Sequence, residues 1–423
     1  MVATTTNQLM TLKTKKFKTT LIKVSFKAKL TQETVTSRIL LANVLRNSSK
    51  KFDSKKQLSI HLENLYGASL AISTKKQGSL HIISAYIQVV NEKFLKSAPP
   101  LFEEALNTLK ELLINPLITE AGFDKSVVEL ESRLLKEEIE AIYDDKTTYA
   151  LKKLVANMCE QENFGVSGDG DLADLATINE KTLVKTYESM LNDDEIDVVV
   201  LGDVDHEATV KTLNASFDFK AQPSKNLSPV DSEEKQIQQV TILEETQAVN
   251  QTKLNIGYRT GVRLTDADYF ALLVMNGVFG AFAHSKLFVN VREKASLCYY
   301  CASQLDNFKG LMYVYSGLDV AQVERAIEII DQQLTDICDG DISEKELLLA
   351  KKSIINAKRE SLDSVNGVLA DTEMTATLGI TADEFIKKVE QVTIAEVSAV
   401  AKKIKKDTIF TLKPAKEAEN NGN

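Results

Sequence analysis

Short stretches of the chain alternate apolar and polar residues, and longer stretches repeat apolar residues at helical spacing. The alternation predicts strands over residues 16–30 and 69–74, and the apolar run over residues 80–90 predicts a third strand. An amphipathic helix is predicted next, because apolar residues then recur every three or four positions. These residues are Phe102, Ala105, Leu106, Leu109 and Leu113. Pro116 ends this helix, since proline interrupts helical hydrogen bonding.

Further helices are predicted around these elements, and an apolar strand over residues 196–202 closes the first part of the chain. The predicted helices span residues 34–47, 55–66, 119–143, 147–160 and 179–191. Residues 220–235 then hold two prolines, three serines and many charges, a composition typical of a linker. We therefore expect an N-terminal domain over residues 1–219 and a C-terminal domain over residues 236–423.

The order of elements after the predicted linker resembles the order before it. A strand over residues 253–261 and a helix over residues 265–279 correspond to the first strand and the first helix. The run from Leu58 to Leu70 resembles the run from Leu287 to Tyr299 at an offset of about 229 residues. This order predicts an α+β fold of two homologous domains, each a mainly antiparallel sheet covered on one face by helices.

The composition narrows the class of partner. Hydrophobic residues make up 43% of the 423 positions, enough for two cores, and the formal net charge is -9. Nucleic acids and anionic membranes require a basic surface, so neither is expected as the main partner. The longest apolar runs fall well short of a membrane span. The four scattered cysteines favour a reducing compartment, and we expect a cytoplasmic location.

A function can be predicted from the stretch over residues 285–299. Its spacing indicates the end of a helix, with Leu287 and Val291 on the apolar face, followed by a strand that begins near Tyr299. Arg292 and Tyr299 are then expected to point into one space. Both also have an ordinary structural explanation, because arginine is favoured at helix C-termini and tyrosine in strands.

The same stretch resembles the C-terminal-domain signature of the pitrilysin/insulinase family of zinc metallopeptidases, the inverzincins. The resemblance implies two repeated domains arranged as a clamshell, and a role for Arg292 and Tyr299 in binding the substrate backbone and stabilising the tetrahedral intermediate. Lys286 departs from the family pattern by replacing an arginine, and Ser296 stands where a turn glycine is usual. The positions in register are Ser285, Lys286, Leu287, Phe288, Val291, Arg292, Glu293, Lys294 and Tyr299.

The zinc motif of this family is missing from the chain. The first histidine, the glutamate and the second histidine of the motif correspond to Leu40, Asn43 and Val44. Aliphatic side chains cannot bind zinc, and an amide cannot take a proton from water. Glu131 and Glu138 match the carboxylates that the family carries on a later helix, although a solvated charged face also explains them. We therefore predict no metal on this chain.

His61 and the pair of Cys298 and Cys301 are weaker candidates for a functional site. His61 is the histidine nearest to the degenerate motif, and we expect a solvated side chain on a helix. Cys298 and Cys301 have the spacing of a redox or metal-binding pair, but the alternation of a strand is expected to place them on opposite faces.

The resemblance implies that the chain retains half of an active site. The leading hypothesis is a metal-free partner subunit of a heterodimeric zinc metallopeptidase, whose zinc is bound by a paralogous subunit and whose substrate is a peptide. The alternative is a peptide-binding or scaffold subunit without peptidase activity in any complex, and self-association is also open. The number of histidines, four, disfavours a self-sufficient peptidase. The resemblance is greatest to a bacterial subfamily linked to aminopentanol modification of elongation factor P.

Overall fold

The computed structural model describes residues 2–6, 9–97, 99–217, 227–233 and 235–415, and it divides the chain into two compact units. Unit 1 comprises residues 1–141 and 166–229, and unit 2 comprises residues 142–165 and 230–423. The chain therefore passes from one unit to the other after residues 141, 165 and 229. Among the described residues, no helix is both long and apolar enough to cross a membrane.

Unit 1 contains a six-stranded sheet in the order β1-β2-β8-β3-β5-β4. All neighbouring strands are antiparallel except β2 and β8, which are parallel. The alternation that predicted the first strand is seen in β3, whose Ile22, Val24 and Phe26 all point into the core. The strands are β1 (Val2–Thr6), β2 (Leu9–Lys13), β3 (Thr19–Lys29), β4 (Ser69–Gln77), β5 (Leu80–Val90) and β8 (Glu195–Gly202).

Helices α1, α3 and α7 supply the apolar residues that pack on this sheet, including Leu41, Leu109 and Leu183. A short hairpin of β6 (Ile118–Thr119) and β7 (Gly122–Phe123) leads into α4. The helices of unit 1 are α1 (Gln32–Leu45), α2 (Lys55–Asn64), α3 (Leu101–Ile114), α4 (Lys125–Asp144), α6 (Leu172–Leu175), α7 (Glu180–Asp193) and α8 (His206–Ser216).

Unit 2 contains a five-stranded sheet in the order β11-β12-β10-β13-β9. Its strands pair as β4-β5-β3-β8-β2 do in unit 1: the last two are parallel and the others antiparallel. Two sheets with one order and one pairing pattern are what the proposed repeat requires. The strands are β9 (Thr241–Gln247), β10 (Thr252–Arg259), β11 (Cys298–Asp306), β12 (Leu311–Leu318) and β13 (Lys405–Pro414).

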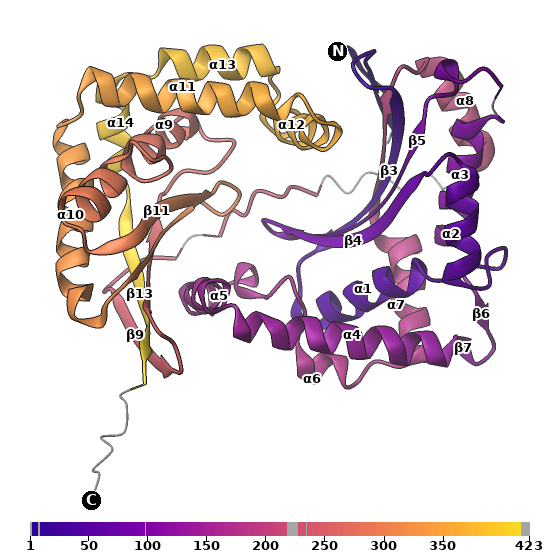
Figure 1. The fold of residues 1–423 in the computed structure, drawn as a ribbon, viewed down its shortest axis with the longest axis horizontal. Helices are drawn as coiled ribbons and strands as arrows, with labels where there is room; N and C mark the ends of the chain where they lie inside the picture. The colour runs from indigo at the N-terminus through magenta and orange to yellow at the C-terminus, as the bar shows by residue number, and fades with distance from the viewer. Residues whose placement is uncertain (1, 7–8, 98, 218–226, 234, 416–423) are drawn as a thin grey trace, which may run out of the picture. The chain divides into compact units, whose positions relative to one another are not determined.

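Helices cover both faces of the second sheet (Figure 1). One face packs against α9, α10, α11 and α14 through strand residues such as Ile256 and Val314. The other face packs against α5 (Lys146–Met158), where Leu154 and Met158 contact a cluster that includes Tyr313. The remaining helices of unit 2 are α9 (Tyr269–Phe279), α10 (Val323–Asp339), α11 (Glu344–Ser361), α12 (Val365–Leu378), α13 (Ala382–Gln391) and α14 (Ile394–Ala401).

The division into units differs from the expected domain boundaries in one respect. Residues 142–165, which include α5, precede the expected linker but belong to unit 2. A buried ion network fastens them there: Arg259 on β10 binds Glu162 and Asp407, and Lys309 binds Glu162 and Asp231. The described part of the expected linker, residues 227–233 and 235, contains no helix or strand.

Candidate functional site

The stretch that carries Arg292 forms a π-helix, η3 (Phe288–Lys294), rather than the end of an α-helix. π-Helical turns are rare and often occur at functional sites. Partly buried polar contacts hold this segment in place: Lys286 Nζ lies 3.1 Å from Glu346 Oε1 on α11, and Asn290 donates a hydrogen bond to Gln333 on α10. The lysine that replaces the family's arginine therefore anchors this segment.

Arg292 and Tyr299 both lie on the surface of unit 2, at the junction between η3 and β11. The guanidinium carbon of Arg292 lies 4.5 Å from the ring centroid of Phe288, the geometry of a cation–π contact. Tyr299 is 82% exposed. The structure thus presents a cationic and a phenolic donor to solvent, and their joint action on one ligand stays a prediction.

Ser296 forms the turn between η3 and β11. Its φ of +52° lies in the left-handed region that favours glycine, and its hydroxyl donates to the Glu293 carbonyl at 3.4 Å. Gly67, 229 positions earlier, precedes β4 with a φ of +72°. Ser296 therefore adopts the conformation of the turn glycine that it replaces.

A β-bulge directly follows this turn and overturns the expectation for the two cysteines. Cys298 lies opposite Leu318 and Cys301 lies opposite Ser316, with a register shift between Cys298 and Tyr300. Leu318 and Ser316 are two positions apart and so share a face of the sheet, and residues directly opposite share it with them. The bulge absorbs one extra residue, which places Cys298 and Cys301 on the same face rather than on opposite ones.

The two thiols have unequal environments. A hydrogen bond from Cys301 lowers the pKa of Cys298 to about 7, with further lowering from the Ser316 hydroxyl and the Arg292 charge, while burial acts in the other direction. The same hydrogen bond, together with burial, raises the pKa of Cys301. Cys298 is half-buried, and Cys301 is buried in the core of unit 2.

The three degenerate motif positions lie on α1 in the core of unit 1. Leu40 and Val44 are part of the apolar core, and Asn43 is buried as well. Among the described residues, no group of three or more His, Cys, Asp and Glu side chains is placed to hold a metal ion. The donors at this place do not fit zinc, because the two positions that should supply imidazoles supply aliphatic side chains.

Glu131, expected to share a solvated face with Glu138, is instead 1% exposed. It points at the turn after α1, where Asn47 Nδ2 donates to Oε1 at 3.0 Å and Arg46 Nη2 lies 3.4 Å from Oε2. Asn47 also donates to the carbonyl oxygen of Asn43. An amide and a guanidinium thus satisfy the buried carboxylate, whereas Glu138 is exposed as expected.

Sequence reasoning missed Arg46 and Asn47 as partners of Glu131. The available signal was the position of Asn47, four residues after Asn43 and therefore on the same face of the helix predicted over residues 34–47, although α1 itself ends at Leu45. The expectation for His61 also needs correction. Its Nε2 lies 2.9 Å from the Thr108 hydroxyl and its ring lies 4.7 Å from that of Phe52, and burial followed by the Lys51 charge lowers its pKa.

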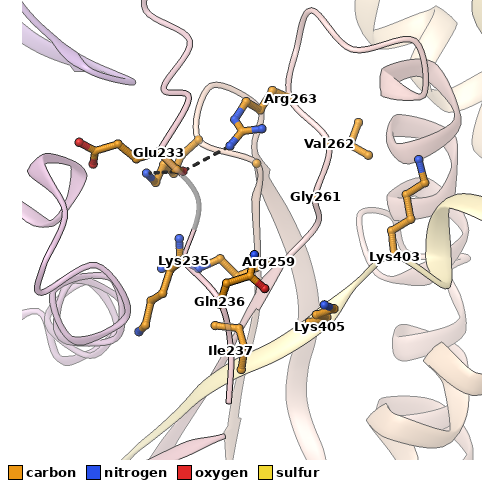
Figure 2. Close-up of a pocket in the computed structure, with 12 residues that line it drawn as sticks. Glu233, Lys235, Gln236, Ile237, Arg259, Gly261, Val262, Arg263, Lys403 and Lys405 are labelled. Atoms are coloured by element: carbon orange, nitrogen blue, oxygen red, sulfur yellow. Dashed lines mark hydrogen bonds between the residues drawn. The ribbon is translucent and has the colours of Figure 1, made fainter. Parts of the chain in front are cut away.

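A basic pocket of about 140 Å³ lies elsewhere in unit 2, between the loop after residue 230 and the start of β13. Figure 2 shows Lys235, Arg259, Arg263, Lys403 and Lys405 around it, and Arg263 donates to the carbonyl oxygen of Glu233. Much of this charge is already neutralised. Arg259 and Lys235 bind Asp407, and Lys403 binds Asp268. The pocket is therefore mainly part of the ion network that holds residues 142–165 and the loop after residue 230 against the sheet of unit 2.

Comparison with known proteins places the chain in a family. Residues 177–354 match the family described as peptidase M16 inactive domain. The chain is 37% identical to the probable inactive metalloprotease YmfF of Bacillus subtilis over 95% of its own length and 94% of that protein. It is 23% identical to the uncharacterized zinc protease YmxG of Bacillus subtilis, over 71% of the chain and 72% of that protein.

A solved structure of a conserved protein from Enterococcus faecalis V583 has a TM-score of 0.90 and 33% identity, and the match covers 97% of this chain and 96% of that one. The fold, the family match and the missing imidazoles agree with one another. The chain belongs to the peptidase M16 family, as a member of its inactive-metalloprotease branch.

Proposed function

We propose that this chain is the metal-free subunit of a heterodimeric zinc metallopeptidase and that it contributes Arg292 and Tyr299 to an active site whose zinc is held by a second chain. One contrast carries the proposal. The carboxylate that would serve a metal, Glu131, is bound by Asn47 and Arg46, whereas Arg292 and Tyr299 remain on the surface.

The chemistry proposed for this chain is hydrogen-bond donation. A guanidinium and a phenol can both donate to the oxygen of a peptide carbonyl, and their bonds strengthen as negative charge develops on that oxygen. Neither group needs a metal on its own chain to do so. The zinc and its bound water are assigned to the partner.

The proposed partner is a paralogue with an intact zinc motif. One relative of this chain, YmxG of Bacillus subtilis, is described as an uncharacterized zinc protease. The proposed substrate is a peptide. The proposed compartment is the cytoplasm, because all four cysteines lie in described residues and none of them forms a disulfide. The internal repeat is proposed on the shared strand order of the two sheets.

Reconstitution tests the proposal. The chain and the zinc-motif paralogue from the same genome are purified separately, mixed, and assayed by size-exclusion chromatography and by cleavage of a quenched-fluorescent peptide library. We expect a complex and peptide cleavage on mixing, and no cleavage by the present chain alone. A stable complex that cleaves no peptide, beside an active zinc peptidase as the assay control, would establish the scaffold role instead.

A further inference from the structure

Cys298 and Cys301 form an adjacent pair of thiols at the start of β11, and the function proposed above does not use them. The bulge places three residue steps of β11 against two of β12, from Leu318 to Ser316. Two strand steps cover roughly 6.6 Å. Cα atoms joined by a disulfide are usually up to about 6.8 Å apart. The register therefore places the two Cα atoms near the upper end of the disulfide range, so that a small movement of the bulge would suffice to bring the sulfurs together.

The surroundings give the two thiols different roles. Cys301 is 2% exposed and packs in the core of unit 2, whereas Cys298 lies half-buried at the edge of that core. The positive charge of Arg292 acts on Cys298 from the adjacent π-helix, and the Cys301 thiol lies on the same face of the strand. These neighbours favour the thiolate of Cys298, which is the nucleophilic form, and leave Cys301 as a thiol beneath it.

The other two cysteines provide a comparison within the same chain. Cys159 is buried, and Cys338 on α10 is half-buried with a pKa that burial raises. Cys159 accepts a hydrogen bond from Arg259 Nη2 at 3.7 Å and so belongs to the buried ion network of unit 2. Cys298 differs because a second thiol, Cys301, lies on the same face of its strand.

We propose that Cys298 and Cys301 are a redox-active dithiol, which a hydroperoxide oxidises reversibly to an intramolecular disulfide. The Cys298 thiolate attacks the hydroperoxide, forming an S–O bond and breaking the O–O bond, and the departing alkoxide takes up a proton to give an alcohol. Cys301 then attacks the Cys298 sulfur, forming the S–S bond and breaking the S–O bond, and its proton leaves with the hydroxyl as water. Two thiols lose two electrons and two protons, and the peroxide is reduced by the same two electrons.

The disulfide would join the two ends of the bulge that contains Tyr299. Tyr299 and Tyr300 are the residues between the two cysteines, so oxidation fixes the backbone that presents Tyr299 to solvent. This oxidation chemistry depends only on this chain and holds whether or not a peptidase complex forms.

Both cysteines fall in one tryptic peptide, residues 295–309, which makes the test direct. The reduced full chain is treated with stoichiometric hydrogen peroxide, free thiols are alkylated, and the peptide is analysed by mass spectrometry. We expect an internal disulfide, seen as loss of two hydrogens with no alkylation, and its full reversal by dithiothreitol. In limiting iodoacetamide at neutral pH, we expect Cys298 to react about tenfold faster than Cys338.

Variants separate the two roles. Cys301→Ser, and Cys301→Ala as a second variant, should leave a sulfenic acid on Cys298 that dimedone traps. Cys298→Ser should abolish oxidation of the peptide, and Cys338→Ser, the matched control, should change nothing. Circular dichroism confirms that each variant is folded. The proposal is overturned if both thiols of the wild-type peptide stay free under peroxide, if the disulfide forms between molecules, or if Cys338 is oxidised as fast as Cys298.

Discussion

The two units share a strand order, but the polar side chains of their candidate sites differ in burial. In unit 1, the carboxylate of Glu131 is buried and satisfied by Arg46 and Asn47, which directly follow α1. In unit 2, Arg292 and Tyr299 lie at the surface, and Tyr299 is 82% exposed. A buried carboxylate that lacks a metal needs hydrogen-bond donors instead. The contacts of Glu131 therefore stabilise the fold of unit 1. A largely exposed tyrosine adds little to folding, which agrees with the binding role proposed for Tyr299.

The largest expected effect concerns the surface pair of unit 2. In the reconstituted complex, Arg292→Ala and Tyr299→Phe should each lower peptide cleavage by about 10²- to 10³-fold, the usual cost of removing one donor to a developing oxyanion. The measurement is kcat/KM on a quenched-fluorescent peptide. Tyr300→Phe is the matched control, because Tyr300 is the next residue but packs near Tyr315. Full activity of both variants in an intact complex would remove the functional interpretation of the pair.

The next effect concerns the buried carboxylate of unit 1. Glu131→Ala should lower the free energy of unfolding by about 2–3 kcal/mol, because it removes the carboxylate that accepts from both the buried Asn47 amide and the Arg46 guanidinium. Glu138→Ala, at the exposed position one heptad later, should change it by less than about 0.5 kcal/mol. Urea denaturation of the two variants measures the difference. Equal effects would show that Glu131 is solvated in solution.

Acid should destabilise unit 1 through His81. This side chain is buried, its Nδ1 accepts a hydrogen bond from Arg38 at 3.3 Å, and burial and the Arg38 charge lower its pKa to about 3. Below pH 6.5 the unfolded chain binds a proton at His81 that the folded chain does not bind. The free energy of unfolding therefore falls as the pH falls, by about 1.4 kcal/mol per pH unit, until the pH reaches the pKa of His81 in the folded chain.

At pH 5 this loss is about 2 kcal/mol. His81→Gln should remove it, which urea denaturation of the variant and the wild type at pH 7 and pH 5 measures. Unit 2 contains one histidine, His284, so hydrogen exchange should show β5 losing protection on acidification before β12 does. An unchanged pH dependence in the variant would assign the acid sensitivity to other groups.

The smallest effect compares the turns before β4 and β11. Ser296→Gly should stabilise the protein by about 0.5–1 kcal/mol, because glycine adopts a positive φ without the strain of a side chain. Gly67→Ala should destabilise it by about 1 kcal/mol through strain alone, since a methyl group there would meet no atom within 4 Å. Thermal unfolding measures both. A Ser296→Gly variant that is less stable than the wild type would contradict the φ of +52°.

Much of the fold could be predicted because apolar periodicity reports which residues are buried. The strands over residues 80–90 and 196–202 and the amphipathic helix after residue 100 lie where the pattern places them. The pattern does not report which core a helix joins. Helix α5 was predicted as a helix, yet its packing on β10 and β13 depends on residues about 100 positions or more away along the chain. Glu162, which follows α5, binds Arg259 on β10, and Arg259 in turn binds Asp407 on β13.

The site was less predictable, for two physical reasons. A bulge adds one residue to a strand without a signal in the alternation, so Cys298 and Cys301 looked as if they faced opposite sides. Glu131 lies among charged residues that are exposed, and its burial depends on donors from the turn after α1. Arg292 and Tyr299 came from resemblance to a family signature, and their positions at the surface agree with that role without testing it.

The zinc content of the separated and reassembled subunits tests the central claim most directly. Each purified protein and the gel-filtered complex is analysed by inductively coupled plasma mass spectrometry after dialysis against a weak chelator. We predict no stoichiometric zinc on the present chain, and zinc on the paralogue and on the complex at one ion per pair. One zinc ion per molecule of the isolated chain would contradict the account.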